Sequence, residues 1–268
     1  MSESFLLKIE NYVAELSFNR PQKANSLNED SGHALKENFE RLDADPNVRV
    51  IILSGEGKHF CAGIDLETLM SVQTGDETCQ AKKNLKIRSF IKMLQESISS
   101  IERCRKPVLA AVHNGCIGGG VDIIAACDIR YCTSEAYFTI KEIDLGLVAD
   151  IGTLQRLPTI LNPGIMAEMA YTGRKVYGPE AKEIGLVNNH WANKEAMMAE
   201  VRTIARMIAS KSPLCVRGTK EMLLYKRDHS VRDSLDNMAN YNSAMLISED
   251  LMEAFQASMM KREATFKD

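Results

Sequence analysis

The sequence predicts an α/β fold followed by a helical C-terminal region, and three observations support this prediction. The first half alternates short, β-branched apolar runs with longer segments whose apolar residues recur every three or four positions. After Pro158 the pattern is mostly helical. The 268 residues exceed a common domain size, but one large α/β domain with a helical appendage accommodates them. We therefore expect a core over residues 1–211 and a helical region over residues 212–268.

The N-terminal segment has the pattern of a β-α-β unit. Two strands are expected over Phe5–Ile9 and Tyr12–Phe18, the second with alternating apolar residues. Asn28 can cap the following helix, which carries acidic residues in its first turn and ends at Asp45-Pro46. The run Val48–Leu53 is short, apolar and β-branched, as is typical of a strand that is covered on both faces.

Further apolar segments predict the rest of the core in the same alternating order. The expected elements are a helix from about residue 80 to Cys104, a strand over Pro107–Val112, a break at Gly115–Gly120, a short helix over Val121–Ala126, strands over Asp128–Cys132 and Leu186–Asn189, and helices from Ser212-Pro213 onward. The polar stretch Ser71–Lys83 is the best candidate for a mobile loop.

The composition excludes several classes of function. The formal charge is −3, with 45% hydrophobic and 26% charged residues, so there is no electrostatic case for nucleic acid binding. No apolar run approaches the roughly 20 residues of a spanning helix, and the first residues form no basic leader. We therefore expect a cytoplasmic protein without membrane attachment. The seven cysteines are scattered and the five histidines isolated, which indicates reduced thiols and no metal site.

The triple glycine Gly118-Gly119-Gly120 needs an explanation, because each glycine inside a helix costs about 1 kcal/mol relative to alanine. It follows a predicted strand and opens a helix, where glycine lets a ligand approach unpaired backbone N–H groups. A tight turn with close helix–sheet packing explains the glycines equally well. The spacing is not the Gly-x-Gly-x-x-Gly dinucleotide fingerprint.

A second glycine-bearing element, His59-Phe-Cys-Ala-Gly-Ile-Asp-Leu66, follows the predicted strand near Leu53 and can offer a second free N–H. Together with other motifs, these segments resemble the enoyl-CoA hydratase/isomerase (crotonase) family along essentially the whole chain. The motifs are Asn19-Arg-Pro-Gln-Lys-Ala-Asn-Ser-Leu27, Phe60-Cys-Ala-Gly-Ile-Asp-Leu66, Gly118-Gly-Gly-Val-Asp122, Asp128-Ile-Arg130, Gly152-Thr-Leu-Gln-Arg-Leu157 and Ala181-Lys-Glu-Ile-Gly-Leu-Val187. Each is weak alone, but their order and spacing are highly specific.

The resemblance implies a spiral of β-β-α turns with a C-terminal helical region that makes homotrimers or dimers of trimers. It also implies an acyl-CoA substrate and no separate cofactor. The backbone N–H groups of Ile64 and Gly119 would hold the thioester oxygen as it becomes an enolate, and each such donor is worth roughly 3 to 4 kcal/mol. Lys23 and Ala24 would lie near the adenine of CoA. The other residues implied in substrate binding are Ala62, Gly63, Asp65 and Leu66.

The carboxylates distinguish between reactions that share this enolate. Hydratases of the family hold a water between two glutamates, whereas this chain has Asp122 and Glu142. A third acid, Asp150, stands where hydratases usually carry a small residue. These three acids match the Δ3,5-Δ2,4-dienoyl-CoA isomerases of the family. The resemblance implies that Glu142 removes the C2 proton, Asp150 delivers one at C6 and Asp122 polarises or orients groups within the pocket. We expect burial among other carboxylates to raise the pKa of Asp150.

Plainer interpretations exist for each acid taken singly. Asp122 is then an acid in a first helical turn, Glu142 a solvated turn residue and Asp150 a cap for a helix near Thr153. The motif positions of Asp65 and Asp144, and the surroundings of His113 and Cys116, indicate structural or packing roles. Two alternative functions also stay open: an enoyl-CoA hydratase or Δ3-Δ2-enoyl-CoA isomerase, and a non-catalytic acyl-CoA-binding protein.

Overall fold

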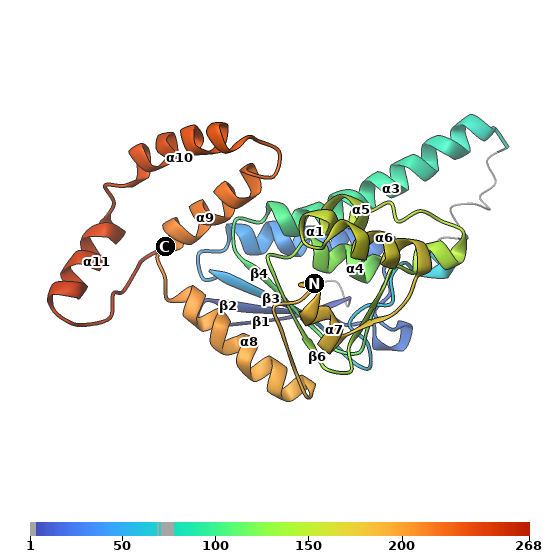
Figure 1. The fold of residues 1–268 in the computed structure, drawn as a ribbon, viewed down its shortest axis with the longest axis horizontal. Helices are drawn as coiled ribbons and strands as arrows, with labels where there is room; N and C mark the ends of the chain where they lie inside the picture. The colour runs from blue at the N-terminus through green and yellow to red at the C-terminus, as the bar shows by residue number, and fades with distance from the viewer. Residues whose placement is uncertain (1–3, 69, 71–77) are drawn as a thin grey trace.

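The computed structural model describes residues 4–68, 70 and 78–268 (Figure 1). Its first elements are the antiparallel strands β1 (Phe5–Glu10) and β2 (Val13–Phe18), close to their predicted bounds. Helix α1 (Glu29–Ala44) begins as expected at Asn28, whose side chain accepts a hydrogen bond from the Ser31 amide at 2.9 Å. Asn28 N–H in turn donates to Ser31 Oγ at 2.8 Å, so the two residues form a capping box.

Two sheets carry the core. Within the described residues, the larger sheet has the order β1-β2-β3-β4-β6-β9, and its neighbours from β2 onward pair in parallel. The smaller sheet has the order β5-β7-β8. The strands after β2 are β3 (Val50–Gly55), β4 (Val108–Val112), β5 (Gly115–Ile117), β6 (Ile129–Thr133), β7 (Tyr137–Thr139), β8 (Val176–Tyr177) and β9 (Asn189–Trp191).

Successive stretches of chain repeat one pattern, in which a strand of the larger sheet is followed by a strand of the smaller sheet and then by a helix. One turn is β4, β5 and α4 (Gly119–Ala125), and the next is β6, β7 and the 3-10 helix η2 (Lys141–Leu145). The segment after β3 joins the same stack through a parallel bridge between Cys61 and Cys116. The expected spiral of β-β-α turns is therefore present, and it brings the segments after β3, β5 and β7 side by side.

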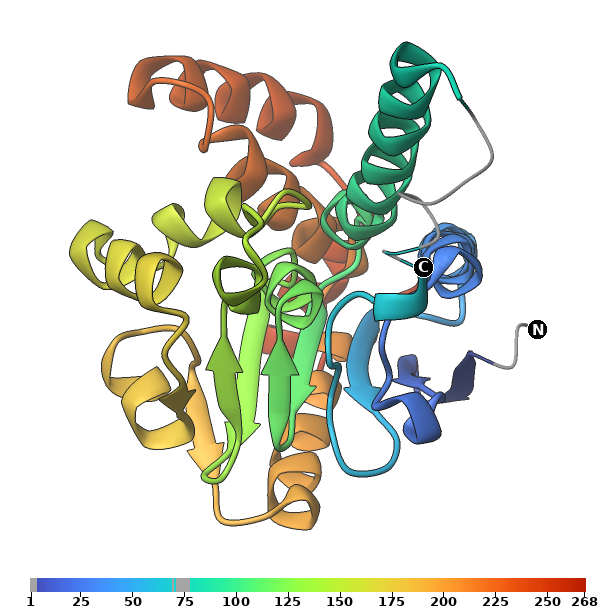
Figure 2. The same cartoon turned by 90° about the vertical axis from the view of Figure 1, so that its right-hand side faces the viewer.

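Helices cover both faces of the larger sheet (Figures 1 and 2). Along β3 every residue is buried, and alternate side chains enter different clusters because strand side chains alternate between faces. Ile51 and Leu53 join the cluster with α1, α3 (Gln80–Arg103) and α4, whereas Val50 and Ile52 pack against α8 (Lys194–Ala209). Further helices of the core are η1 (Pro21–Lys23), α5 (Thr153–Arg156), η3 (Leu157–Thr159), α6 (Pro163–Thr172) and α7 (Gly178–Glu183).

The C-terminal helices α9 (Pro213–Tyr225), α10 (Val231–Met245) and α11 (Glu249–Met259) extend away from the sheets as an arm (Figure 1). Buried Lys220 anchors α9 to the core through Asp128, with Nζ and Oδ2 2.7 Å apart. The guanidinium of Arg49 donates to the carbonyl oxygens of Ala209 and Phe266. The predicted boundary at residues 211–212 falls between α8 and α9, and the division into two domains stays a prediction.

Several predicted element bounds are wrong. Gly115–Ile117, expected inside a glycine-rich break, is strand β5, because the neighbouring backbone of β7 supplies its hydrogen bonds. Strand β8 was not expected, and β9 lies mostly beyond the predicted Leu186–Asn189. The candidate loop Ser71–Lys83 lies outside the described residues over 71–77, and its last four residues belong to α3.

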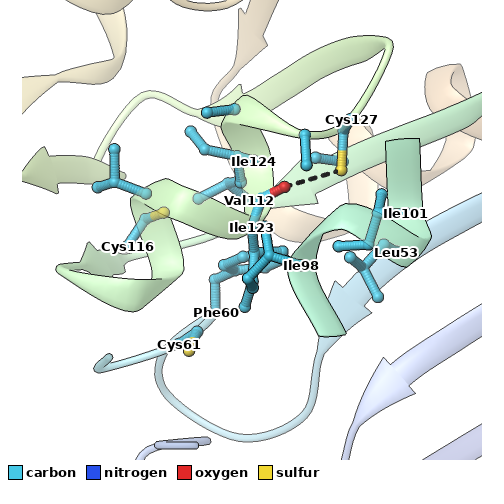
Figure 3. Close-up of a cluster of buried hydrophobic side chains, with 14 of the residues drawn as sticks. Leu53, Phe60, Cys61, Ile98, Ile101, Val112, Cys116, Ile123, Ile124 and Cys127 are labelled. Carbon is cyan, nitrogen blue, oxygen red and sulfur yellow. Dashed lines mark hydrogen bonds between the residues drawn. The ribbon is translucent and has the colours of Figure 1, made fainter. Parts of the chain in front are cut away.

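Cysteines contribute to the core beneath the glycine-rich segment. Figure 3 shows Cys61, Cys116 and Cys127 among Phe60, Ile123 and neighbouring aliphatic side chains, all buried in one cluster. Burial raises the pKa of the Cys61 and Cys127 thiols to about 12, so they pack as neutral apolar groups. Among the described residues, none of the helices combines the length and apolar character that crossing a membrane requires.

Candidate active site

The first element of the site is the loop after β3, and a bridge to Leu27 fixes it. The Leu27 N–H donates to Gly63 O and the Asp65 N–H donates to Leu27 O, each at 2.7 Å. This pattern holds both neighbours of Ile64 but does not use the Ile64 amide. The N–H of Ala62 donates to the carbonyl oxygen of Ala24 at 3.0 Å, which ties the start of the loop to the same N-terminal segment.

The second element is the turn from β5 into α4, which lies directly against that loop. Cys61 N–H donates to Gly115 O at 3.2 Å, and Ile117 N–H donates to Cys61 O at 3.0 Å. A Cβ built on Gly63 would stand only 3.2 Å from the amide nitrogen of Gly119. Within the described part of the chain, no hydrogen bond of the Ile64 or Gly119 amide is present. The two amides can therefore both donate to one ligand oxygen.

The three consecutive glycines have different reasons to be glycine. Gly118 has φ +49°, and a Cβ there would lie 2.9 Å from Glu142 Oε1. A Cβ on Gly120 would lie 2.8 Å from Cys61 O, which is the close packing of the plainer interpretation. Gly119 has room for a Cβ at ordinary contact distances and instead brings its amide to the cavity wall. Close packing and an exposed donor therefore both operate in this turn.

A cavity of about 580 Å³ opens in front of these amides. Its wall is predominantly apolar, with a small number of polar groups, as is typical of a site for a small organic ligand. The lining residues are Ala62, Gly63, Ile64, Leu66, Ile87, Phe90, Ile91, Leu94, Ile117, Gly118, Gly119, Lys141, Glu142, Leu145, Leu147, Val148, Asp150 and Ile151.

Glu142 projects from η2 into this cavity beside the glycine turn. Its carboxylate lies against Gly118, and its buried Oε2 has no hydrogen-bond partner in the described structure. Burial raises the pKa of Glu142, and the charge of Asp150 raises it further, although a hydrogen bond from its own backbone opposes the shift. An unpartnered carboxylate oxygen with increased basicity, next to two unused amides, is suited to remove a proton beside a carbonyl group.

Asp122 lies deeper than expected and does not line the cavity. Its side chain is fully buried on α4, and Oδ1 accepts a hydrogen bond from the Thr153 amide at 2.5 Å. Oδ2 has no partner in the described structure. Burial raises the pKa of Asp122 to about 7, with a further contribution from the charge of Glu142. Asp122 therefore supports the start of α5 from behind the cavity wall.

Asp150 lies on the cavity wall, in the segment that leads to α5. It is not the cap of that helix, because the cap position belongs to Gly152 and the Thr153 amide is bound by Asp122. Its backbone carbonyl accepts a hydrogen bond from Gln95 Nε2 at 2.7 Å. Partial burial raises the pKa of the Asp150 carboxyl, in the expected direction. Among the described residues that line the cavity, Glu142 and Asp150 are the two with carboxyl groups.

The other predicted ligand contacts are divided between the cavity and its surroundings. Ala62, Gly63, Ile64, Leu66 and Gly119 line the cavity. Asp65 does not, because its carboxylate faces Arg20 at 3.3 Å and accepts a hydrogen bond from the Glu67 amide at 3.1 Å. Lys23 forms an exposed ion pair with Glu67 at 3.0 Å. Ala24 has a left-handed φ of +49° and holds the Ala62 amide.

The residues expected to pack have structural partners. Asp144 forms an exposed ion pair with Lys141. The His113 ring is buried and its Nε2 lies 2.9 Å from Gly57 O. These contacts agree with structural roles for both residues.

Sequence reasoning missed the wall contributed by α3. Ile87, Phe90, Ile91 and Leu94 line the cavity from this helix, and their spacing of three and four residues places them on one face. That spacing is visible in the sequence, but it predicts a buried stripe without indicating that the stripe faces a cavity. Gln95, on the same helix, was also missed, because a polar residue in a helix carries no signal for a partner 55 residues away.

The fold and the site together define a class of protein. A spiral of strand pairs presents two unused backbone amides to a largely apolar cavity, with carboxyl groups beside them, as is suited to stabilising an enolate during proton transfer. A model of the family described as "Enoyl-CoA hydratase/isomerase" matches residues 8–268. The chain belongs to the enoyl-CoA hydratase/isomerase family.

Relatives of known name and structure cover nearly the whole chain. It is 50% identical to the peroxisomal Delta(3,5)-Delta(2,4)-dienoyl-CoA isomerase of Arabidopsis thaliana, over 95% of this chain and 92% of the relative. Its identity to the mitochondrial enzyme of the same name from Homo sapiens is 44%, over 94% and 77% of the two chains. The crystal structure of an enoyl-CoA hydratase from Bacillus anthracis superposes with a TM-score of 0.90 at 28% identity, covering 98% and 99%.

Proposed function

We propose that this enzyme converts a 3,5-dienoyl-CoA to the 2,4-dienoyl-CoA. The observation that carries the proposal is the pair of carboxyl groups, from Glu142 and Asp150, on the wall of one cavity that also contains the Ile64 and Gly119 amides. The relatives named above as dienoyl-CoA isomerases, at 44% and 50% identity, support the same reaction.

The reaction transfers a proton from one end of a conjugated system to the other. The carboxylate of Glu142 removes a proton from C2, and the electrons move into an enolate whose oxygen accepts hydrogen bonds from Ile64 and Gly119. The carboxylic acid of Asp150 then gives a proton to C6, and the double bonds shift to positions 2 and 4. The atomic composition and the net charge of the substrate are unchanged. The reaction leaves Glu142 protonated and Asp150 ionised, so a proton must return before the next turnover.

The surroundings of both groups affect the proton transfers that this scheme requires. Partial burial raises the pKa of Asp150, which favours the acid form that can donate. Glu142 also has a raised pKa, which increases its strength as a base when it is ionised. Asp122, behind the wall, contributes by holding Thr153 and therefore the segment that follows Asp150.

The alternative functions fit the site less well. A hydratase needs a second acid to hold water opposite Glu142, but the Asp122 carboxylate is fully buried and outside the cavity wall. A Δ3-Δ2-enoyl-CoA isomerase does not require Asp150. A non-catalytic acyl-CoA-binding protein has no need for a basic Glu142 carboxylate whose Oε2 has no partner in the described structure. We further propose a homotrimer or dimer of trimers, with an acyl-CoA as ligand and no additional cofactor; the cytoplasmic location stays a prediction.

The test is an ultraviolet assay with a 3,5-dienoyl-CoA, in which the more conjugated 2,4-product is followed. We expect Asp150→Asn to lower kcat for isomerisation by about 10²- to 10⁴-fold, because it removes the proton donor for C6. Exchange of C2 hydrogen with deuterium from solvent should continue, since Glu142 and the two amides remain. Glu142→Gln is the matched comparison and should lose both reactions. A wild-type enzyme that is inert in this assay but hydrates a 2-enoyl-CoA would overturn the proposal.

A further inference from the structure

We infer that Gln95 is a positioning residue that sets where Asp150 delivers its proton; this inference rests on the proposed function. Gln95 Nε2 donates to the backbone carbonyl of Asp150 at 2.7 Å. At the other end of the same amide, Oε1 accepts a hydrogen bond from Lys92 Nζ at 3.1 Å. Both ends of the Gln95 side chain are therefore engaged, and the donor is held toward Asp150.

The position of the Asp150 carboxyl depends on its main chain. Within the described residues, this carboxyl has no hydrogen bond or ion pair with another side chain, and its own backbone is the group that hydrogen-bonds to it. The side chain is short, with two rotatable bonds. A shift of the Asp150 backbone consequently moves the proton donor by a similar distance.

A second contact holds the far end of the same segment against the same helix. Arg156 Nη2 donates to Ser99 Oγ at 3.0 Å and to Glu102 Oε2 at 3.2 Å. Gln95, Ser99 and Glu102 are spaced by four and three residues, so they form one polar stripe on α3. The segment from Asp150 to Arg156 is thus attached to this stripe at both ends.

Glycine at position 152 allows this attachment. Gly152 has φ +140°, and a Cβ there would collide with Arg156 Nη1. The guanidinium therefore lies directly on the Gly152 backbone while it contacts Glu102. Glu102 is also paired with Arg227, which follows the end of α9, and this pair connects the stripe to the C-terminal arm.

The same helix also forms part of the cavity. Ile87, Phe90 and Ile91 of α3 line the wall with which an acyl chain makes contact in the proposed function. Because α3 is one continuous helix from Gln80 to Arg103, it holds the apolar wall and the Asp150 backbone in a fixed position relative to each other. The distance between a bound C6 atom and the Asp150 carboxyl is set by this helix, and Gln95 is the direct link.

The experiment compares two reactions of one variant. We expect Gln95→Leu, which removes the donor at similar size, to lower kcat for isomerisation by about 10- to 100-fold, because a small misplacement of a catalytic group has effects of this order. C2 deuterium exchange should stay within about twofold of wild type, since Glu142 and the two amides do not depend on Gln95. KM should change little. Gln80→Leu is the matched control, because Gln80 is exposed at the start of the same helix and bonds to Asn84.

Each contrary result has a distinct meaning. Unchanged isomerisation by Gln95→Leu would overturn the inference alone. Equal losses of isomerisation and C2 exchange, together with a lower Tm, would show a merely structural role and would also overturn it. A wild-type enzyme that exchanges the C2 hydrogen but does not isomerise a 3,5-dienoyl-CoA would overturn the proposed function, and this inference with it.

Discussion

The three acids that the sequence marks as site residues differ in how deeply they are buried. Asp122 is fully buried, Glu142 is partly buried with one oxygen free of partners, and Asp150 is the most exposed of the three. Burial raises the pKa of all three groups, with Asp122 reaching about 7. Three carboxyl groups that lie close together repel one another when all are ionised. Ionising Asp122, the most deeply buried of the three, therefore costs free energy.

This cost predicts a pH dependence of stability that Asp122→Asn removes. Between the unfolded pKa near 3.8 and the folded pKa of about 7, the native protein keeps a proton on Asp122 that the unfolded chain has lost. The stability from this group is therefore complete below about pH 4 and is lost as pH rises to 7. At roughly 1.36 kcal/mol per pKa unit the loss is on the order of a few kcal/mol. Urea unfolding at a series of pH values measures it.

The variant should gain stability relative to wild type as pH rises from 4 to 8. Asn keeps an oxygen for the Thr153 amide but carries no charge. Asp236→Asn, at an exposed acid on α10, controls for the removal of a carboxyl group. Parallel stability curves for wild type and Asp122→Asn across this range would contradict the prediction. Protein concentration must be held constant, because an oligomer gains apparent stability with concentration.

At the scale of an element, the turn into α4 joins the two halves of the site. The Gly118 N–H donates to the Thr139 carbonyl oxygen at 2.9 Å, while Glu142 Oε1 lies 2.9 Å from the place that a Cβ on Gly118 would take. A side chain at this position would therefore meet the proposed base directly. The glycine determines both the path of the backbone and the position of the carboxylate.

Gly118→Ala should lower kcat for isomerisation by at least about 10²-fold, because the new methyl group displaces the Glu142 carboxylate. The positive φ adds roughly 1 to 3 kcal/mol of destabilisation. Gly185→Ala is the matched control, because Gly185 has φ +81° but nothing lies within 4 Å of the place that a Cβ would take. It should carry the backbone cost with unchanged activity. Activity assays and urea unfolding of both variants test this, and equal activities would contradict it.

The sequence predicts those parts of the fold that are determined by residues close to one another along the chain. Asn28 caps α1 with its own neighbour Ser31, and the buried run of β3 is visible as an apolar segment. Strand β5 falls inside the predicted break, because its three residues gain strand character from distant partners, β7 and the Cys61 backbone.

The candidate site also has a part that the sequence predicts and a part that it does not predict. The acids and amides are marked by motif spacing, whereas the burial of Asp122 behind the wall and the contact from Gln95 depend on how distant elements pack. Spacing along the chain sets which groups are available. It does not set their depth or the polar residues that hold them.

At the scale of the whole molecule, the C-terminal arm exposes apolar surface that the single chain does not cover. On α11 the side chains of Met252, Phe255 and Met259 are 56%, 59% and 77% exposed. Their spacing of three and four residues makes them one continuous stripe on the helix. Exposed apolar stripes of this kind are typical of protein interfaces. The proposed homotrimer or dimer of trimers would cover such a stripe with a second copy of the chain.

The mass in solution tests this arrangement. Light scattering after size exclusion should give about 90 or 180 kDa, three or six times the chain mass of 29.9 kDa. Phe255→Glu should shift the population toward smaller species, because a charge must be desolvated at the interface. Gln256→Glu adds the same charge at an exposed neighbouring position and should leave the mass unchanged. A monomeric wild-type protein at micromolar concentration, or equal masses for wild type and Phe255→Glu, would show that the α11 stripe is not the contact between copies.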